Sequence, residues 1–325
     1  QTRCRPIGTM DRKITARERL RIERQQMPEQ DSEERAVNFT EVNLGFPEKL
    51  ALLEADRCLQ CKNPLCIDGC PVRVNIPLFI EHLSEGKMAE AADSLLCDNA
   101  LPGVTGRVCP QETQCEDLCI RGKKGMPVGI GYLERYVADW ARDNKDALPS
   151  YKAPSTGRSV AVIGSGPSGL TAAGELARLG HAVTIYEALH KPGGVLFYGI
   201  PQFRLPKEIL VREIDGMRDM GVKFVMNYPV GKAESLDSIR ERHDATLIGT
   251  GAGLPWFLGI PGENLNGVYS ANEFLTRVNL MGGYKFPQDS DTPIKKIKRI
   301  AVIGAGNTAM DSARTSKRLD PEVVY

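Results

Sequence analysis

Cysteines are the residues of this chain best suited to chemistry, and most of them are crowded into two short stretches. Residues 57–71 read RCLQCKNPLCIDGCP, which gives the spacing C-x2-C-x4-C-x3-C-P. A second stretch, VCPQETQCEDLC, follows at residues 108–119. The two stretches contribute Cys58, Cys61, Cys66, Cys70, Cys109, Cys115 and Cys119. Where disulfides are rare, thiols grouped in this way hold metals or take part in redox reactions.

Three kinds of chemistry fit such a cluster, and the spacing separates them. Zinc sites combine two C-x2-C knuckles, or one knuckle with histidines, but this region has one knuckle and one histidine, His82. A disulfide framework is typical of exported chains, and the N-terminus lacks the apolar centre of a signal peptide. The x2 start, the x3 step and the closing proline match ferredoxin-type runs, although the middle spacing is x4 rather than x2. The pattern therefore favours iron–sulfur clusters in a reducing, cytoplasmic setting.

The number of cysteines leaves one ligand open. Two cubane clusters take four ligands each, one more than the seven grouped cysteines supply. Cys97 is one candidate for the missing ligand, and a non-cysteine oxygen or nitrogen atom is the other. Apart from such a role, Cys4 and Cys97 are expected to be ordinary free cysteines.

A glycine-rich turn marks a second kind of site. Residues 160–187 read VAVIGSGPSGLTAAGELARLGHAVTIYE, which predicts a strand, a G-x-G-x-x-G turn, a helix and a strand ending in an acid. Gly164 permits the tight turn, Gly166 lets a pyrophosphate approach the backbone, and Gly169 allows helix and strand to pack closely. Pro167 opens the helix, whose N-terminus favours phosphate. Glu187 can accept a hydrogen bond from a ribose hydroxyl, so the stretch predicts a dinucleotide site.

Two further glycine-rich stretches follow. KPGGVLFYGIPQFRLP contains Gly193 and Gly194, and DATLIGTGAGLP runs from a predicted strand into Gly249 and Gly251. Glycines at these places suit the close approach of the backbone to a bulky ligand. Simple loop turns are the alternative interpretation for either stretch alone.

The same strand–turn–helix plan recurs near the end of the sequence. IAVIGAGNTAMD has the form G-x-G-x-x-A at Gly304, Gly306 and Ala309, with Asn307 and Thr308 between them. A second dinucleotide site after the first predicts a flavin domain followed by a nicotinamide domain. The residue that distinguishes NAD from NADP lies about twenty positions beyond the first glycine, near Tyr325, where the sequence stops. The cofactor is therefore NAD or NADP, and the sequence is expected to be part of a longer chain.

The elements that position these motifs follow from periodicity. Residues 76–96 predict two short helices broken at Gly86, and residues 129–144, GIGYLERYVADWARDN, predict an amphipathic helix. Residues 1–45 are dense in charge, which predicts a solvated arm or exposed helix, with a strap against a partner subunit as the alternative. Residues 144–159, NKDALPSYKAPSTGRS, are rich in Pro, Ser, Gly and Lys and predict a linker, placed at 146–158.

Several function classes are disfavoured. No cysteine follows Cys119, so a redox-active cysteine pair within the flavin domain is excluded. A hydride that reaches a flavin can instead leave as single electrons through clusters. The four histidines are scattered and form no catalytic or zinc-binding pattern. The net charge of +1 gives no reason to expect nucleic acid, and no apolar run is long enough to predict a membrane span.

Taken together, the motifs resemble a known family. The stretches RCLQCKNPLCIDGCPV, GRVCPQETQCEDLC, IGYLER, IGSGPSGL, PGGVLFYGIPQFRLP and AVIGAGNTAMD, over about residues 30–325, are similar to the small-subunit family of bacterial NADPH-dependent glutamate synthase. That family also covers the large subunit of the electron-bifurcating NADH-dependent ferredoxin:NADP oxidoreductase, and the N-terminal half of dihydropyrimidine dehydrogenase is similar. The resemblance implies two [4Fe–4S] clusters, one FAD, and NAD(P)H on the second glycine turn.

The resemblance also implies which residues hold each group. In such proteins the cluster ligands interleave, so Cys58, Cys61, Cys66 and Cys119 would hold one cluster. The other would be held by Cys70, Cys109, Cys115 and an oxygen ligand at Glu134, a position where the pyrimidine enzyme has glutamine. Arg204 matches an arginine of the family that contacts the flavin.

We therefore predict an α/β chain with an N-terminal all-α iron–sulfur domain. The expected parts are a charged arm at 1–45, a helical two-cluster domain at 46–145, the linker at 146–158, a Rossmann-type FAD domain at 159–265 and the start of a Rossmann-type NAD(P)-binding domain at 266–325. The expected function is electron transfer between NAD(P)H, FAD and clusters, to a partner subunit or to ferredoxin.

Three versions of that function remain open. The chain could belong to a ferredoxin:NADP oxidoreductase, which can bifurcate electrons and pairs with a flavoprotein or iron–sulfur subunit. It could be the small subunit of glutamate synthase, which pairs with an amidotransferase large subunit. It could also be a cluster relay subunit with no NAD(P)H chemistry of its own.

Overall fold

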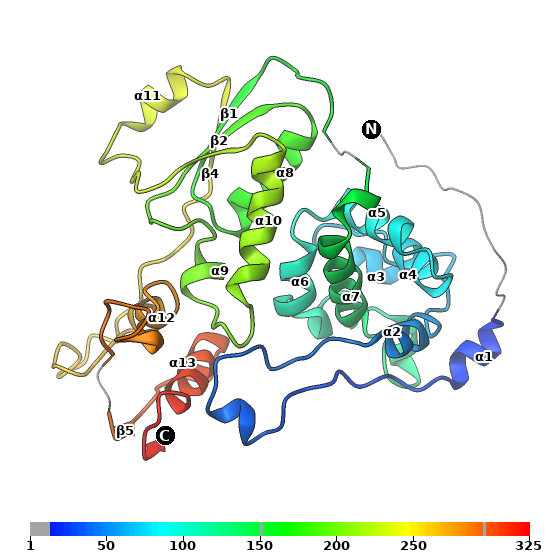
Figure 1. Cartoon of the computed structure of the whole chain (residues 1–325), viewed down its shortest axis with the longest axis horizontal. Helices are drawn as coiled ribbons and strands as arrows, with labels where there is room; N and C mark the ends of the chain where they lie inside the picture. The colour runs from blue at the N-terminus through cyan, green and yellow to red at the C-terminus, as the bar shows by residue number, and fades with distance from the viewer. Residues whose placement is uncertain (1–13, 150–151, 295–296) are drawn as a thin grey trace. The chain divides into compact units, whose positions relative to one another are not determined.

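The computed structural model describes residues 14–149, 152–294 and 297–325, and its chain divides into two compact units (Figure 1). The first, here called the helical unit, comprises Gln1–Glu29 and Asn43–Tyr151. The second, here called the α/β unit, comprises Gln30–Val42 and Lys152–Tyr325. The predicted arm at 1–45 is thus divided between the two units.

The helical unit is built from short helices joined by the loops that carry the cysteines. Its α-helices are α1 (Ala16–Arg21), α2 (Glu48–Ala55), α3 (Leu65–Asp68), α4 (Ile76–Ser84), α5 (Met88–Asp98), α6 (Pro102–Val108) and α7 (Ile130–Asp143). Short 3-10 turns at Gln111–Thr113, Ile120–Lys123 and Lys145–Ala147 complete it. The predicted break between α4 and α5 falls at Gly86, whose φ of +73° suits glycine. Apolar side chains of α4, α5 and α7, among them Phe79, Leu95 and Leu133, form the core.

The α/β unit contains a parallel sheet with strand order β3-β2-β1-β4. The strands are β1 (Ser159–Ile163), β2 (Ala182–Tyr186), β3 (Lys223–Val225) and β4 (Ala245–Ile248). Central β1 pairs with β2 on one side and β4 on the other, with Val162 opposite Ile185 and Leu247. Helix α8 (Pro167–Arg178) connects β1 to β2, and α10 (Lys207–Asp219) precedes β3. Right-handed crossovers of this kind put the carboxyl ends of β1 and β2 at one edge, where nucleotides bind.

The second glycine turn starts another β–α–β unit. Strands β5 (Arg299–Ile300) and β6 (Val323–Val324) pair in parallel, and α13 (Asn307–Lys317) lies between them in the sequence. The remaining elements are α9 (Val195–Tyr198), α11 (Leu236–Glu241), α12 (Ala271–Asn279) and a 3-10 turn at Gly283–Lys285. The predicted α/β class with an N-terminal helical iron–sulfur domain is confirmed.

Residues 30–42 are held against the α/β unit by specific contacts. The backbone N–H of Val42 donates to the carbonyl of Phe203 at 3.0 Å. The ring of Phe39 stacks on Tyr284 at a centroid distance of 4.2 Å. Arg318 donates from Nε to the carbonyl of Asn38 at 2.7 Å. This segment is therefore a packed part of the α/β unit rather than a solvated arm.

Within the described residues, no helix combines the length and the apolar character needed to cross a lipid bilayer.

A glycine in α6 allows that helix to lie directly against α7. A Cβ at Gly106 would meet the backbone nitrogen of Arg135 at 2.6 Å, a separation that neither helix can accept without moving. We expect Gly106→Ala to lower the free energy of unfolding by about 1–3 kcal/mol, measured by urea denaturation. Gly122→Ala is the control, since its Cβ would find its nearest neighbour at 3.9 Å. Equal effects of the two substitutions would contradict this account of the packing.

Candidate functional site

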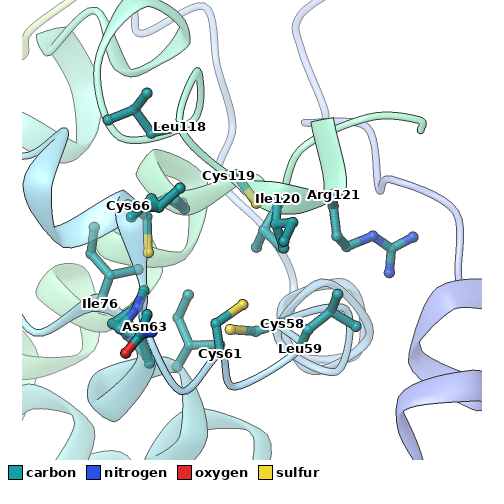
Figure 2. A pocket seen from close by; sticks show the side chains of 16 residues that line it. Cys58, Leu59, Cys61, Asn63, Cys66, Ile76, Leu118, Cys119, Ile120 and Arg121 are labelled. Carbon is teal, nitrogen blue, oxygen red and sulfur yellow. The ribbon is translucent and has the colours of Figure 1, made fainter. Parts of the chain in front are cut away.

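Four cysteines from two distant stretches of sequence line a single pocket of the helical unit. Cys58 and Cys61 lie in the loop after α2, Cys66 lies on α3, and Cys119 precedes the turn Ile120–Lys123. Figure 2 shows their side chains around one space. Most of the other lining residues are apolar: Leu59, Leu65, Ile76, Ile80, Leu118, Ile120, Val128 and Ile130. The pocket thus offers four sulfur donors in surroundings that disfavour water.

Burial and mutual repulsion disfavour the charged form of these thiols. Burial, followed by the charges of Cys119 and Cys61, raises the pKa of Cys58 to about 11. Burial, followed by the charges of Cys58 and Cys119, raises the pKa of Cys66 to about 12. Burial and Cys119 also raise the pKa of Cys61. Thiolates here need a positively charged partner, and iron supplies such charge while binding the sulfurs.

The remaining three grouped cysteines lie near Glu134. Burial, followed by the charges of Glu134 and Cys70, raises the pKa of Cys109 to about 11. The pKa of Cys115 is also raised, by burial first and then by Glu116, Glu134, Cys70 and Cys109. Cys70 and Glu134 thus lie close enough to Cys109 and Cys115 to act on both thiols.

The carboxylate of Glu134 is buried on α7 and is held in one orientation. Its Oε1 accepts a hydrogen bond from Thr105 Oγ1 at 2.5 Å and another from Asn99 Nδ2 at 2.9 Å. Hydrogen bonds of this kind orient ligands in metal centres. The residues therefore fit an oxygen ligand at this position.

The other candidate for the missing ligand, Cys97, is not among the free cysteines. It lies on α5 and is disulfide-bonded, so the expectation of an ordinary free thiol is wrong. Cys4 lies outside the described residues. Nowhere in the described ranges do three or more His, Cys, Asp or Glu side chains gather so as to hold a single metal ion. A zinc site would need its cysteine sulfurs to lie about 2.3 Å from one shared position, that of the metal ion.

Glycines let the two cysteine stretches approach each other. A Cβ at Gly69, between Cys66 and Cys70, would lie 2.7 Å from the carbonyl oxygen of Gln114. A Cβ at Gly131, on the first turn of α7, would lie 2.3 Å from the side chain of Gln111. The contact at Gly69 brings the two cysteine stretches together, and the contact at Gly131 brings α7 against the second stretch, so donors far apart in the sequence lie close in space.

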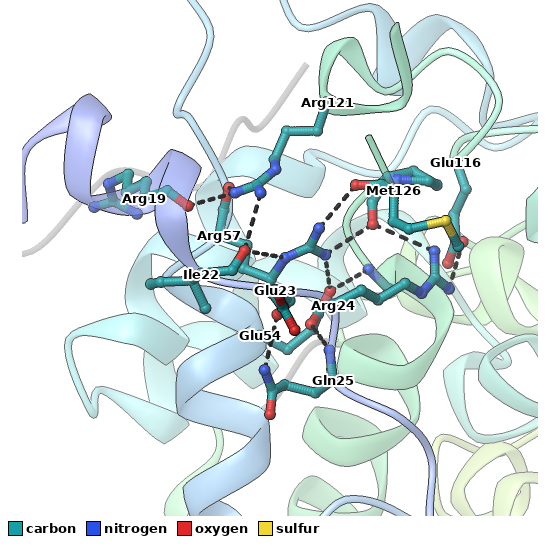
Figure 3. Close-up of polar contacts among 12 residues, drawn as sticks. Arg19, Ile22, Glu23, Arg24, Gln25, Glu54, Arg57, Glu116, Arg121 and Met126 are labelled. Atoms are coloured by element: carbon teal, nitrogen blue, oxygen red, sulfur yellow. Dashed lines mark hydrogen bonds and ion pairs between the residues drawn. The ribbon is translucent and has the colours of Figure 1, made fainter. Parts of the chain in front are cut away.

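A buried ion pair anchors the loop that carries Cys58 (Figure 3). Glu54 and Arg57 are 0% and 1% exposed, and Arg57 Nη1 donates to Glu54 Oε1 at 2.5 Å. Arg57 also donates to the carbonyls of Met126 and Pro127, each at 2.8 Å. Glu54 Oε2 accepts from the backbone N–H of Gln25 at 2.7 Å. Through these hydrogen bonds the pair holds together the end of α2, the segment at Gln25 and the segment at Met126 and Pro127. Loss of one partner would leave the other charge buried and unpaired.

The first glycine turn has the geometry of a dinucleotide fingerprint. Gly164 has φ +100°, and a Cβ there would lie 2.4 Å from the carbonyl oxygen of Gly249. A Cβ at Gly169 would lie 2.0 Å from the carbonyl oxygen of Gly164, which shows how closely α8 approaches β1. At Gly166, the N-cap of α8, a Cβ would find nothing within 4 Å. That open space beside the helix N-terminus, where Pro167 is the first helical residue, suits a phosphate group.

Glu187 connects the end of β2 to the glycine turn. Its Oε2 accepts hydrogen bonds from the backbone N–H of Ser165 at 2.9 Å and from its hydroxyl at 2.5 Å. Its Oε1 accepts from the backbone N–H of Leu189 at 2.8 Å. The Ser165 hydroxyl in turn accepts from the backbone N–H of Gly193 at 3.0 Å. The carboxylate is therefore fixed at the edge where a nucleotide ribose would lie.

The second glycine-rich stretch packs against the first. Gly193 and Gly194 have φ of +120° and +52°, and a Cβ at Gly194 would lie 2.8 Å from Gly166 Cα. Gly251, after β4, has φ +69° and open space around it. Arg204 donates from Nη1 to Asp311 Oδ2 at 2.6 Å, so the arginine of QFRLP is paired with α13. No sequence motif predicts that ion pair.

The last glycine turn repeats the plan of the first. Gly304 has φ +128°, and a Cβ there would meet Ala309 Cβ at 3.2 Å. Gly306 is the N-cap of α13 and has nothing within 4 Å of an added Cβ. Asn307 and Thr308 are the first two residues of the helix. Their backbone N–H groups belong to the helix N-terminus, where a second phosphate group would bind.

Comparison with known proteins finds two family models that match successive parts of the chain. Residues 35–146 match the family model described as dihydropyrimidine dehydrogenase domain II, 4Fe-4S cluster. Residues 158–325, just over half of the chain, match the model of the pyridine nucleotide-disulphide oxidoreductases. The chain belongs to the pyridine nucleotide-disulphide oxidoreductase family, with an iron–sulfur domain at its N-terminal end.

Particular relatives agree with the expected resemblance. The chain is 37% identical over 301 residues to the glutamate synthase [NADPH] small chain of Escherichia coli (strain K12), covering 91% of this chain and 63% of the relative. It is 37% identical over 288 residues to glutamate synthase [NADH] of Schizosaccharomyces pombe (strain 972 / ATCC 24843), covering 87% of this chain and 14% of that protein. The chain therefore spans less than two thirds of the length of these relatives. Mycobacterium tuberculosis FprA in complex with NADPH is 29% identical, with a TM-score of 0.41 over 50% of this chain and 36% of FprA, a likeness too slight to support an inference.

Lys207 gives the α/β unit a specific dependence on pH. Its enclosed ammonium donates to the carbonyls of Leu196 at 2.9 Å and Ile200 at 2.5 Å, and burial lowers its pKa to about 7. Between about pH 7 and pH 10.5 the unfolded chain holds a proton that the folded chain lacks, so raising the pH across this window stabilises the fold. The free energy of unfolding should rise by at most about 1.4 kcal/mol per pH unit.

Urea denaturation of wild type and Lys207→Met at several pH values tests this dependence. We expect the free energy of unfolding to rise more with pH in the wild type than in Lys207→Met. Lys191→Met is the control, because Lys191 lies over the same Phe197 ring but is exposed. Parallel curves for wild type and Lys207→Met would contradict the expectation.

Proposed function

We propose that this chain is the electron-input part of an NAD(P)H-dependent oxidoreductase, which binds one FAD and two [4Fe–4S] clusters. The observation that carries the proposal is the pocket shared by Cys58, Cys61, Cys66 and Cys119, in a chain that also has two dinucleotide turns. When bound, FAD accepts or releases a hydride and the clusters carry single electrons.

The helical unit contributes the cluster ligands and their dry surroundings. The thiols of the first pocket would hold one cluster, while its apolar lining limits access of water. Cys70, Cys109, Cys115 and Glu134 would hold the other. Interleaving of the two sets ties both cysteine stretches to both clusters, so the loops cannot separate without loss of ligands.

The α/β unit contributes the nucleotide sites. The N-terminus of α8 beside Gly166 would bind the FAD pyrophosphate, and Glu187 would accept a hydrogen bond from the ribose. Arg204 is proposed to contact the flavin while it pairs with Asp311. The N-terminus of α13, with Gly306, Asn307 and Thr308, would bind the pyrophosphate of NAD or NADP.

The partner is proposed from the relatives. Similarity to glutamate synthase small chains supports a large amidotransferase subunit as the final acceptor of electrons. A ferredoxin:NADP oxidoreductase would instead pair the chain with a small flavoprotein that carries a [2Fe–2S] cluster. Purification of the natural complex distinguishes them by the size and cofactors of the second chain. If neither NADPH nor NADH bleached the flavin spectrum, only the third version would remain, a cluster relay subunit with no NAD(P)H chemistry of its own.

Cys61→Ser tests the first cluster site. We expect the purified protein to fall from about eight to about four iron atoms while its FAD content stays unchanged, since the substitution removes a ligand of one cluster only. Asn63→Ser is the matched control, because Asn63 lines the same pocket but carries no thiol. Iron and flavin analysis of both variants measures the effect. Retention of about eight iron atoms by Cys61→Ser would refute the assignment.

Glu134→Ala tests the oxygen ligand of the second cluster. We expect the electron paramagnetic resonance (EPR) spectrum of one reduced cluster to change and that of the other to remain. Glu134→Gln keeps an oxygen donor and should change the spectrum less. Thr105→Val is the control, since it removes the hydroxyl that bonds to the carboxylate, to Asn99 and to the Leu101 carbonyl but leaves the carboxylate itself in place. If Glu134→Ala left both spectra as in the wild type, Glu134 would not be a ligand.

A further inference from the structure

Two arginines lie beside the first cysteine pocket, and within the described part of the chain both bond only to carbonyl oxygens. Arg121 lines the pocket, and its guanidinium donates to the carbonyls of Arg19 at 2.5 Å, Ile22 at 3.0 Å and Arg57 at 3.2 Å, with a longer bond of 3.4 Å to Leu20. Arg19 Nη1 donates to the carbonyl of Cys58 at 2.8 Å and to that of Asp56 at 3.3 Å. Figures 2 and 3 show Arg121 at the edge of the pocket and among the carbonyls of the N-terminal segment.

The charge of these two arginines is therefore not neutralised locally. Among the described residues, neither forms an ion pair with a carboxylate, whereas neighbouring Arg57 is paired with Glu54. Both charges lie close to the thiols, since Arg121 lines the pocket and Arg19 donates to the backbone carbonyl of Cys58. Carbonyl bonds hold the guanidinium groups in place without cancelling their charge.

The second set of donors lies in the opposite kind of surroundings. Glu134 and Glu116 are buried here, at 8% and 5% exposed, and Glu116 directly follows Cys115 in the sequence. Arg24 forms an ion pair with Glu116 at 2.8 Å, so the charge of that arginine is largely cancelled. The first pocket is thus flanked by two net positive charges, and the second site by carboxylates.

Reduction of a cluster adds one electron, so neighbouring charge changes its reduction potential. Net charge and hydrogen bonding around a cluster are known determinants of that potential. We propose that Arg121, together with Arg19, raises the reduction potential of the cluster held by Cys58, Cys61, Cys66 and Cys119. The inference rests on the proposed function, because it requires that both clusters are present. Arg121 and Arg19 are positioning and tuning residues; they bind no iron, and no proton or bond is transferred at either one.

A functional consequence follows for the direction of electron flow. The cluster beside the arginines would be the better electron acceptor of the two, since positive charge stabilises its reduced form. Electrons would then rest preferentially on the cluster held by the first pocket. The N-terminal segment that carries Arg19 would accordingly act on redox chemistry without contributing a ligand.

Potentiometric titration followed by EPR spectroscopy, on the anaerobically purified full chain with its cofactors, tests the proposal. For Arg121→Gln we expect the equilibrium constant for one-electron reduction of one cluster to fall about tenfold, a shift of about 59 mV to lower potential. The midpoint of the other cluster should not move. Arg121→Lys keeps the charge and should shift less. Lys124→Gln, which removes an exposed charge from the same loop, is the matched control and should shift neither midpoint.

The two proposals fail in different ways. A wild-type protein with fewer than two cluster signals would overturn the proposed function. Two cluster signals whose midpoints are both unchanged in Arg121→Gln would overturn this inference and leave the proposed function intact. If Arg121→Gln does not fold, Arg19→Gln replaces it, since Arg19 lies in the last turn of α1 and its Nη1 bonds to the carbonyls of Cys58 and Asp56. The signal that shifts must be the one lost in Cys61→Ser; a shift of the other signal would also contradict the inference.

Discussion

Like-charged donors brought close together in a dry interior are the constraint on which the helical unit depends. Burial, together with neighbouring cysteines and the Glu134 carboxylate, raises the pKa values of the cysteine thiols, so their thiolates are unfavourable without a cationic partner. The fold must hold together donors whose charged forms are unfavourable in the absence of metal. It does so with the close contacts of Gly69 and Gly131 to the second cysteine stretch and with the buried pair of Glu54 and Arg57. Binding of iron would then release the protons of the thiols and stabilise the thiolates.

The α/β unit meets a different requirement, which is to bring free backbone N–H groups to a phosphate. Parallel strands β1 and β2 end at one edge, and α8 starts there with open space at Gly166. Ser165 and Glu187 tie the turn to the end of β2, while Gly193 donates to the same serine. The N-terminus of α13 repeats the arrangement at Gly306. Transfer of a hydride between two dinucleotides requires that both are bound in one unit. The two helix N-termini, at Gly166 and Gly306, would suit such a pair.

Sequence motifs predicted those parts of the structure that are determined locally. Both glycine turns, the break at Gly86 and the helix of residues 129–144 follow from spacing and periodicity, because these depend on neighbours in the chain. The grouping of Cys119 with Cys58 came from the resemblance alone, since sequence proximity points to Cys70 instead. Contacts between distant residues were not foreseen: the hydrogen bonds of Arg57 to Met126 and Pro127, the pair Arg204–Asp311, the packing of residues 30–42, and the enclosed ammonium of Lys207. They depend on tertiary neighbours that no local pattern encodes.

Native mass spectrometry of the anaerobically purified chain, combined with analysis of iron and acid-labile sulfide, tests the central claim most directly. The account predicts an excess mass equal to two [4Fe–4S] clusters and one FAD, with iron and inorganic sulfide in equal amounts. A protein that carries a single zinc ion, or that contains no inorganic sulfide, would contradict it.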